Sequence, residues 1–237
     1  MEWTDDAIVI ATRPHGETSA VVTALTREHG RHAGLVRGGA GKAARGSIQP
    51  GNRLQLTWKA RLTEQLGNFT WELQSTDGTR WLSDAGRLAA ISSACALIEA
   101  TLPERESHPT AFDALASLLA ALQGVDWAGD YVRWELDLLT ELGYGLDLSR
   151  CAATGTNDDL AYVSPRSGRA VSLSAGEAYR DRLLRMPRFL GSDEIADRGE
   201  LVVGLALTGH FLERWVFAAI GKALPPARAR LVAALKA

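Results

Sequence analysis

Apolar residues recur at every second position in the first 75 residues of the chain, which is the pattern of strands that bury one face. Turns rich in glycine and proline separate these runs. The alternating positions are Ile8 and Ile10; Val21, Thr23 and Leu25; Leu54, Leu56 and Trp58; and Phe69, Trp71 and Leu73. Because most of these strands have no helical segment between them, we predict a small OB-like barrel rather than a parallel sheet.

The periodicity becomes helical after Asp77-Gly78, and Asp84 is placed to cap a helix that runs to about residue 100. Further helices are predicted after Pro109, over 127–142, 174–184 and 199–220, and at the carboxyl end. Residues 145–173 are rich in turn formers and predict a loop-rich insert or small ribbon. The fold class is therefore α+β: an amino-terminal OB-like β-barrel over 1–80, then an all-α domain over 81–237 that carries the insert.

Composition and charge limit the cellular compartment and the binding partners that we expect for the protein. The formal net charge is -2, from 26 basic and 28 acidic residues, so no field of the whole molecule attracts nucleic acid or acidic membranes. The two cysteines are too few for a disulfide framework, and the acidic amino terminus does not resemble a secretory signal. The longest uncharged stretches fall short of the ~20 residues that span a bilayer. We expect a cytoplasmic protein without a membrane partner.

One stretch departs from this balance. Between Glu28 and Glu64 the chain has no acidic residue but carries seven basic ones, at Arg31, Arg37, Lys42, Arg45, Arg53, Lys59 and Arg61. A local excess of cations is what the phosphates of a nucleic acid select, because each neutralised phosphate releases counterions. The alternative interpretation is a solvated positive face of a small barrel.

The alternation over 53–59 places Arg53 and Lys59 opposite the apolar face, with Arg61 beyond the predicted strand. Residues 38–47 resemble a phosphate-binding loop only in composition, since the glycine and hydroxyl positions of that motif are not met; they predict a flexible basic loop. The aromatic residues at 58, 69 and 71 share the parity of the core leucines. We therefore expect them in the core rather than stacked on bases.

Signals of catalysis are weak throughout the chain. The five histidines lack metal-binding spacing, and no nucleophile motif is found. Asp158-Asp159 is interpreted as a turn, and Cys95 as a buried inert thiol. The sequence therefore predicts neither an enzyme nor a cofactor, and a hydrolase or transferase with degenerate motifs is the least favoured alternative.

With these residues in view, the chain resembles the RecO family of bacterial recombination mediators. Residues 133–145 end in Leu142-Gly143-Tyr144-Gly145 and are followed by Cys151, similar to the family's helix before its first zinc cysteine. The segment 162–165 with Gly168, and the segment 16–19 after the first strand, resemble the family as well. The resemblance covers nearly the whole chain and implies a barrel followed by a helical domain with a zinc-ribbon-like insert.

The zinc site of the family is degenerate here. Cys151 occupies the first cysteine position, but Thr154, Ser172 and Ala175 stand at the other three. A structural zinc site takes four ligands, so the resemblance predicts no metal in this chain.

The resemblance implies a protein that binds single- and double-stranded DNA, anneals complementary strands and, with its partner RecR, helps RecA load onto DNA coated by single-stranded DNA-binding protein. The seven cations named above are the expected DNA contacts, with little reading of base sequence. Arg133 is the candidate cation for the acidic tail of single-stranded DNA-binding protein; alternatively it pairs with Asp130 or Asp137 on its own helix. The alternative function is a protein-only adaptor that does not bind DNA directly.

Overall fold

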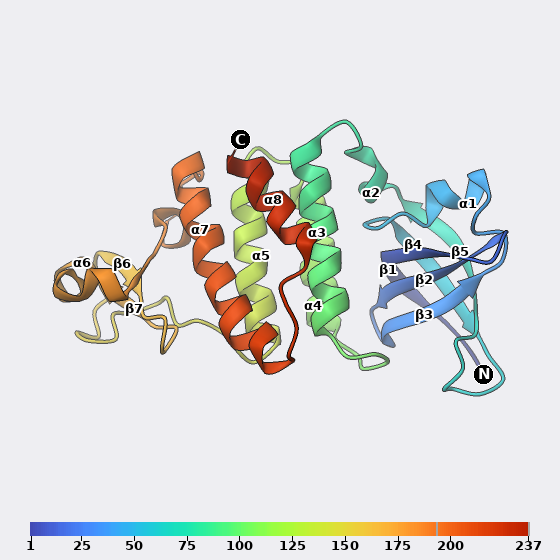
Figure 1. The fold of residues 1–237 in the computed structure, drawn as a ribbon, viewed down its shortest axis with the longest axis horizontal. Coiled ribbons are helices and arrows are strands. Elements are labelled where there is room, and N and C mark those ends of the chain that lie inside the picture. Colours follow the sequence, from blue (N-terminus) through green and yellow to red (C-terminus); the bar gives the residue numbers. More distant parts are fainter. Residues whose placement is uncertain (193, 237) are drawn as a thin grey trace. The chain divides into compact units, whose positions relative to one another are not determined.

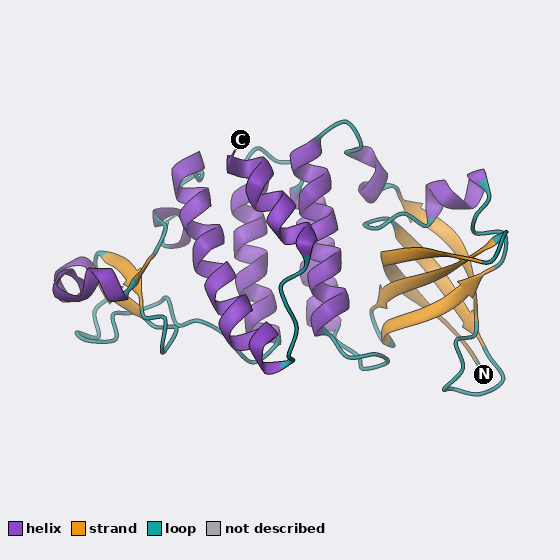
Figure 2. Cartoon of the chain, in the orientation of Figure 1, coloured by secondary structure: helices purple, strands orange, loops and turns teal. Residues whose placement is uncertain are grey.

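Five strands form a closed barrel in the amino-terminal part of the chain (Figures 1 and 2). The computed structural model describes residues 1–192 and 194–236. The strand order is β1-β2-β3-β5-β4, and β4 pairs back with β1. Neighbouring strands are antiparallel except β3 and β5, which run parallel and pair at Leu35 and Asn68. The prediction of a small barrel is confirmed, and the barrel is closed. Its strands are β1 (Glu2–His15), β2 (Ser19–Thr26), β3 (Gly30–Val36), β4 (Arg53–Lys59) and β5 (Asn68–Ser75).

The predicted alternation fills the barrel on β4 but stops halfway along β5. Leu54, Leu56 and Trp58 are at most 1% exposed, and Phe69 on β5 is buried as well. Trp71 is half-buried and packs against this core. The prediction that Leu73 belongs to the core is wrong, because its side chain is 45% exposed. Apolar parity therefore indicates the inner face only where neighbouring strands enclose the position.

The long strand β1 is buried on both faces in its middle part. Ile8 and Ile10 are buried along with Ala7 and Val9, so this segment is a continuous apolar run. The helix α3 (Ala85–Thr101) packs on the outer face, where the Cys95 thiol lies 3.8 Å from the Val9 carbonyl. Burial raises the pKa of this thiol to about 12, as expected for an inert buried cysteine.

The predicted long helices are present, with their apolar faces buried. The carboxylate of Asp84 accepts a 3.0 Å hydrogen bond from the Arg87 N–H, so the predicted cap of α3 is confirmed. Phe112, Leu115 and Leu118 are buried on the helix that begins at Pro109. The helices are α2 (Asp77–Arg80), α4 (Pro109–Ala121), α5 (Trp127–Glu141), α7 (Arg198–Phe211), which continues as a π-helix (Leu212–Phe217), and α8 (Pro226–Lys236).

The insert is built around a small three-stranded sheet of order β7-β6-β8. Its strands are β6 (Leu160–Val163), β7 (Ala170–Ser172) and β8 (Leu184–Arg185). The predicted helix over 174–184 is confirmed in part: α6 (Leu173–Gly176) is followed directly by a 3-10 helix (Glu177–Arg182). The helical segment ends before the predicted end at 184, because Leu184 pairs with Val163 as the start of β8.

The contacts of the chain divide it into two compact units. The first comprises residues 1–120 and 225–231; the second comprises 121–224 and the residues from 232 onward. The change from strand to helix, at 75–77, lies inside the first unit. Over residues 1–192 and 194–236, no helix has both the length and the apolar character required to cross a membrane.

Candidate nucleic-acid interface

Five of the seven predicted DNA-binding cations are available for a ligand. In the part of the chain that the structure describes, none of them forms an ion pair with a carboxylate. Four are exposed and Arg53 is half-buried. The pairing of Arg53 with Ser75 places it at the start of β4. The five residues are Arg37, Lys42, Arg45, Arg53 and Arg61.

A short helix, α1 (Lys42–Ser47), positions two of these cations beside the barrel (Figure 1). The prediction of a loop over 38–47 is wrong for residues 42–47, which form this helix. Three hydrogen bonds tie its end to the barrel. The Thr12 hydroxyl donates to the Ile48 carbonyl at 2.6 Å, and the Asn52 amide donates to the Gly46 and Ser47 carbonyls. Ile48 itself is buried in the barrel core. Lys42 and Arg45 are therefore held on a fixed element.

Arg31, one of the seven expected DNA contacts, is a structural residue rather than an open cation. Its side chain is only 16% exposed. The Nε group donates to the Leu102 carbonyl at 2.9 Å, and the guanidinium pairs with Glu104 at 3.2 Å. Both partners follow α3, so the sequence window around Arg31 gave no sign of them.

Lys59 is also paired, with Glu2 of the neighbouring strand β1 at 2.9 Å. This hydrogen-bonded pair lowers the pKa of the Glu2 carboxyl and raises the pKa of the Lys59 amine. Both side chains are largely exposed, and an exposed pair of this kind contributes little to stability. Lys59 can therefore leave Glu2 at little cost in stability, whereas Arg31 cannot leave its partners without breaking buried contacts.

The cations form two groups instead of one continuous strip. Arg53 and Lys59 lie at opposite ends of β4, about 20 Å apart at the rise of a strand. Arg53 is next to Asn52, which holds α1, so it belongs with the cations of that end. Arg61 lies in the loop after β4, at the other end.

Sequence reasoning missed a further exposed cation, Arg80 of α2. A Cβ added to Gly78 of the same helix would lie 2.0 Å from the Pro50 carbonyl, so this short helix is pressed onto the turn that leads into Arg53. No ion pair involving Arg80 is found among the described residues. Gly78 was the one signal in the sequence, because a glycine permits close packing. Its contact with the turn at Pro50 is visible only in the structure.

In the second unit, Arg133 is already occupied. Its guanidinium pairs with Asp126 at 3.0 Å and with Asp130 at 3.2 Å, and it also donates to the Phe189 carbonyl. It lies 5.2 Å from the centre of the Phe189 ring. Of the alternative partners expected on its own helix, Asp130 is the one observed, and Asp126 takes the place of Asp137.

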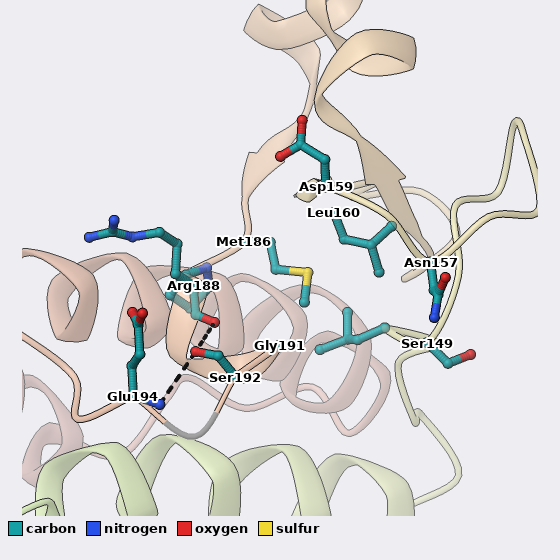
Figure 3. Close-up of a pocket in the computed structure, with 11 residues that line it drawn as sticks. Ser149, Asn157, Asp159, Leu160, Met186, Arg188, Gly191, Ser192 and Glu194 are labelled. Carbon is teal, nitrogen blue, oxygen red and sulfur yellow. Dashed lines mark hydrogen bonds between the residues drawn. The ribbon is translucent and has the colours of Figure 1, made fainter.

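A cavity of about 480 Å³ lies next to the segment that Arg133 holds (Figure 3). Leu160 and Met186 supply apolar surface, and Arg188 stands at its border with Glu194. The Ser192 hydroxyl donates to the Arg188 carbonyl at 3.2 Å and accepts from the Glu194 N–H at 3.4 Å, which shapes this wall. Because Arg133 binds Phe189, it positions the wall rather than lining the cavity.

The residues around Cys151 do not fit a zinc ion. The Cys151 sulfur accepts the Ser172 N–H at 3.3 Å and lies 3.5 Å from the Ser172 hydroxyl. These hydrogen bonds, with those from Thr154, lower the pKa of the thiol. One sulfur with hydroxyl neighbours is not the set of four nitrogen and sulfur ligands that a structural zinc requires. Over 1–192 and 194–236, no group of three His, Cys, Asp or Glu side chains could hold a metal.

The architecture defines a class of protein: a closed amino-terminal barrel with a basic surface, joined to a helical part that carries a small sheet. Comparison with known families gives the particular one. Residues 1–75 match the model described as "Recombination protein O N terminal", and residues 82–222 match "Recombination protein O C terminal". The chain belongs to the RecO family.

Individual relatives agree over nearly their full lengths. A "DNA repair protein RecO" of Rhodospirillum centenum is 58% identical over 98% of this chain and 94% of its own. Proteins of the same name from Rhodospirillum rubrum and Caulobacter vibrioides are 49% and 47% identical, covering 100% and 96% of this chain and 97% and 95% of their own. Membership of this family supports a role in DNA repair and recombination.

Proposed function

We propose that this protein binds single- and double-stranded DNA through its barrel, anneals complementary strands and, with RecR, promotes the loading of RecA onto DNA coated by single-stranded DNA-binding protein. It acts in the cytoplasm without a cofactor or a catalytic site. The observation that carries the proposal is the set of five barrel cations without a carboxylate partner among the described residues, within a stretch that has no acidic residue from 29 to 63.

The chemistry of this surface suits phosphates. Arginine and lysine side chains bind the backbone whatever the bases are, so binding is independent of sequence. Neutralising phosphates also lowers the repulsion between two strands, which favours annealing without any bond-making step. The fixed helix α1 and the exchangeable Lys59 extend this surface to both ends of β4.

The helical part supplies the proposed contact with single-stranded DNA-binding protein. An acidic tail with an apolar end needs an apolar pocket beside a cation. The cavity beside Leu160 and Met186 offers apolar surface. The cation is Arg188, whose side chain is 73% exposed and pairs with Asp197 and Glu200 at 3.9 Å, so the carboxylates of the tail would replace these two partners. Arg133 contributes by holding Phe189, next to Arg188. We infer that the sheet β7-β6-β8 with Cys151 is a degenerate zinc ribbon held by hydrogen bonds.

The test compares two matched charge reversals in DNA binding and strand annealing. One variant changes Arg37, Lys42 and Arg45 to Glu; the control changes three exposed arginines of the second unit, Arg150, Arg166 and Arg182, to Glu. The proposal predicts that only the barrel variant loses binding and annealing. Equal losses in both variants would show a diffuse charge effect and contradict the proposed surface.

A parallel titration with purified single-stranded DNA-binding protein separates the adaptor function from the proposed one. If the wild-type chain binds that protein but no DNA, it is an adaptor and direct DNA binding is refuted. Changing Arg188 to Glu should weaken the protein complex and leave binding to free DNA intact, since this residue lies in the second unit.

A further inference from the structure

Trp71 differs from the other aromatic residues expected in the barrel core. Trp58 and Phe69 are 1% and 2% exposed, whereas Trp71 is half-buried. Part of its side chain packs on the core, and the residue lines two cavities on the barrel, of about 390 and 360 Å³. An indole supported by a packed core and open to solvent is a fixed aromatic surface.

The larger cavity lies where the barrel is least tightly paired. The parallel strands β3 and β5 pair at Leu35 and Asn68. Arg37 follows Leu35 by two residues and Trp71 follows Asn68 by three, so both lie beyond this pair in the same chain direction. The cavity is lined by Arg37, Asn68, Phe69, Thr70 and Trp71.

The smaller cavity continues from this one across the outer surface of the barrel. Thr70 and Trp71 line both cavities. The remaining lining of the smaller cavity is polar, with Thr57 and Gln55 of β4, Thr4 of β1 and the carboxylate of Glu72. These hydroxyl, amide and carboxylate groups suit the base and sugar of a nucleotide, whereas Arg37 in the other cavity suits its anionic phosphate.

We propose that Trp71 stacks on an unpaired base of single-stranded nucleic acid while Arg37 binds the adjoining phosphate. The proposal rests on the proposed DNA-binding function and adds the preference for unpaired bases. In a duplex each base is already stacked on its neighbours and cannot reach the indole. Arg37 is exposed and has no ion pair among the described residues, so its charge is free for the phosphate. Lys42 and Arg45 of α1 follow it and favour a polyanion over an isolated apolar side chain.

The test uses Trp71→Leu, which keeps an apolar side chain on the core but removes the aromatic face, and Trp71→Phe, which keeps an aromatic face. Leu73→Ala is the control on the same strand, because Leu73 is exposed and lines neither cavity. Each variant is titrated against labelled oligothymidylate, an abasic strand of equal length and a duplex. Unfolding midpoints establish that the variants are folded.

The proposal predicts that Trp71→Leu weakens binding to oligothymidylate by about 5- to 150-fold, the range for loss of one stacked base. Trp71→Phe retains most of the affinity, and Leu73→Ala matches the wild type. The abasic strand and the duplex bind Trp71→Leu as they bind the wild type. Arg37→Gln weakens binding to all three.

Three results would overturn the proposal. If the wild type binds oligothymidylate and Trp71→Leu binds it equally well, base stacking by Trp71 is refuted and the DNA-binding function is not. A wild-type chain that binds none of the three probes refutes both. The third result concerns the fluorescence of Trp71, which is the difference between the spectra of the wild type and Trp71→Phe. If an acidic apolar peptide quenches this fluorescence and oligothymidylate does not, the site binds a protein ligand.

Discussion

Replacing Arg31 with alanine separates the structural cation of the barrel from the cations available to a ligand. Arg31 lies on β3, in the same acid-free stretch as Arg37, and sequence alone does not distinguish the two. In the structure Arg31 is almost enclosed and holds the segment after α3, whereas Arg37 is exposed at the end of its strand. The two substitutions should therefore have opposite effects on stability and on DNA binding.

The magnitude follows from the contacts of Arg31. A hydrogen bond from a charged donor to a buried group contributes about 1.5–3 kcal/mol, and the acceptor here is the carbonyl of the buried residue Leu102. The ion pair with Glu104, which is 59% exposed, adds at most about 1 kcal/mol. Arg31→Ala should therefore lower the free energy of unfolding by about 2–3 kcal/mol. Arg37→Ala should change it by less than about 0.5 kcal/mol.

Urea unfolding followed by tryptophan fluorescence measures these changes, since Trp3, Trp58 and Trp71 all lie in the barrel. Glu104→Gln serves as the control, because it removes the ion pair and keeps the hydrogen bond to Leu102. DNA affinity, measured well below the unfolding transition, should fall for Arg37→Ala and stay unchanged for Arg31→Ala. If Arg31→Ala is as stable as the wild type and binds DNA more weakly, the assignment of Arg31 as structural is wrong.

Three further predictions concern other parts of the structure. Burial lowers the pKa of His32 to about 4, so between about pH 6.5 and pH 4 the unfolded chain binds a proton that the folded protein does not. The free energy of unfolding should therefore fall by up to about 3 kcal/mol over this range. Unfolding curves of His32→Phe should lack this loss. Gly34→Ala would place a Cβ 2.6 Å from the Phe69 ring and should destabilise the barrel by about 1–3 kcal/mol in urea; an unchanged midpoint would contradict this packing. Ser172→Ala should raise the pKa of Cys151, read from thiolate absorbance against pH, because it removes the first hydrogen bond that lowers it.

Local pattern predicted the strands of the barrel and the long helices. On β1 and β2 the alternating residues that it named are not those of the barrel core, which holds Val9 and Val22 instead. Alternation identified the buried face of β4, and a single capping aspartate marked the start of α3. It failed where pairing partners far along the chain decide the structure. The helix predicted over 174–184 is α-helical only to Gly176 and ends at Arg182, because Leu184 pairs with β6. Leu73 is exposed although it pairs with the buried Leu54.

The candidate site shows the same limit. The run of cations is visible in the sequence, but the acids that neutralise two of them come from elsewhere in the chain. Glu2 pairs with Lys59 from the neighbouring strand β1, and Glu104 pairs with Arg31 from the segment after α3. The alternation along β5 predicted that Trp71 is a core residue. Trp71 is only half-buried, and it lies beyond the position at which β3 and β5 pair. Charge and parity along a strand do not report what lies beside it in space.

The salt dependence of DNA binding tests the central claim most directly. Single strands release about 0.7 counterion per neutralised phosphate, so five unpaired cations predict a slope of about −3.5 for the logarithm of the binding constant against the logarithm of salt concentration. Changing Arg37, Lys42, Arg45, Arg53 and Arg61 to Gln should leave only the slope that Lys59 contributes, about −0.7, while Arg150, Arg166 and Arg182 to Gln should leave the wild-type slope unchanged. A steep slope that survives the fivefold substitution would show that the barrel cations are not the DNA-binding surface.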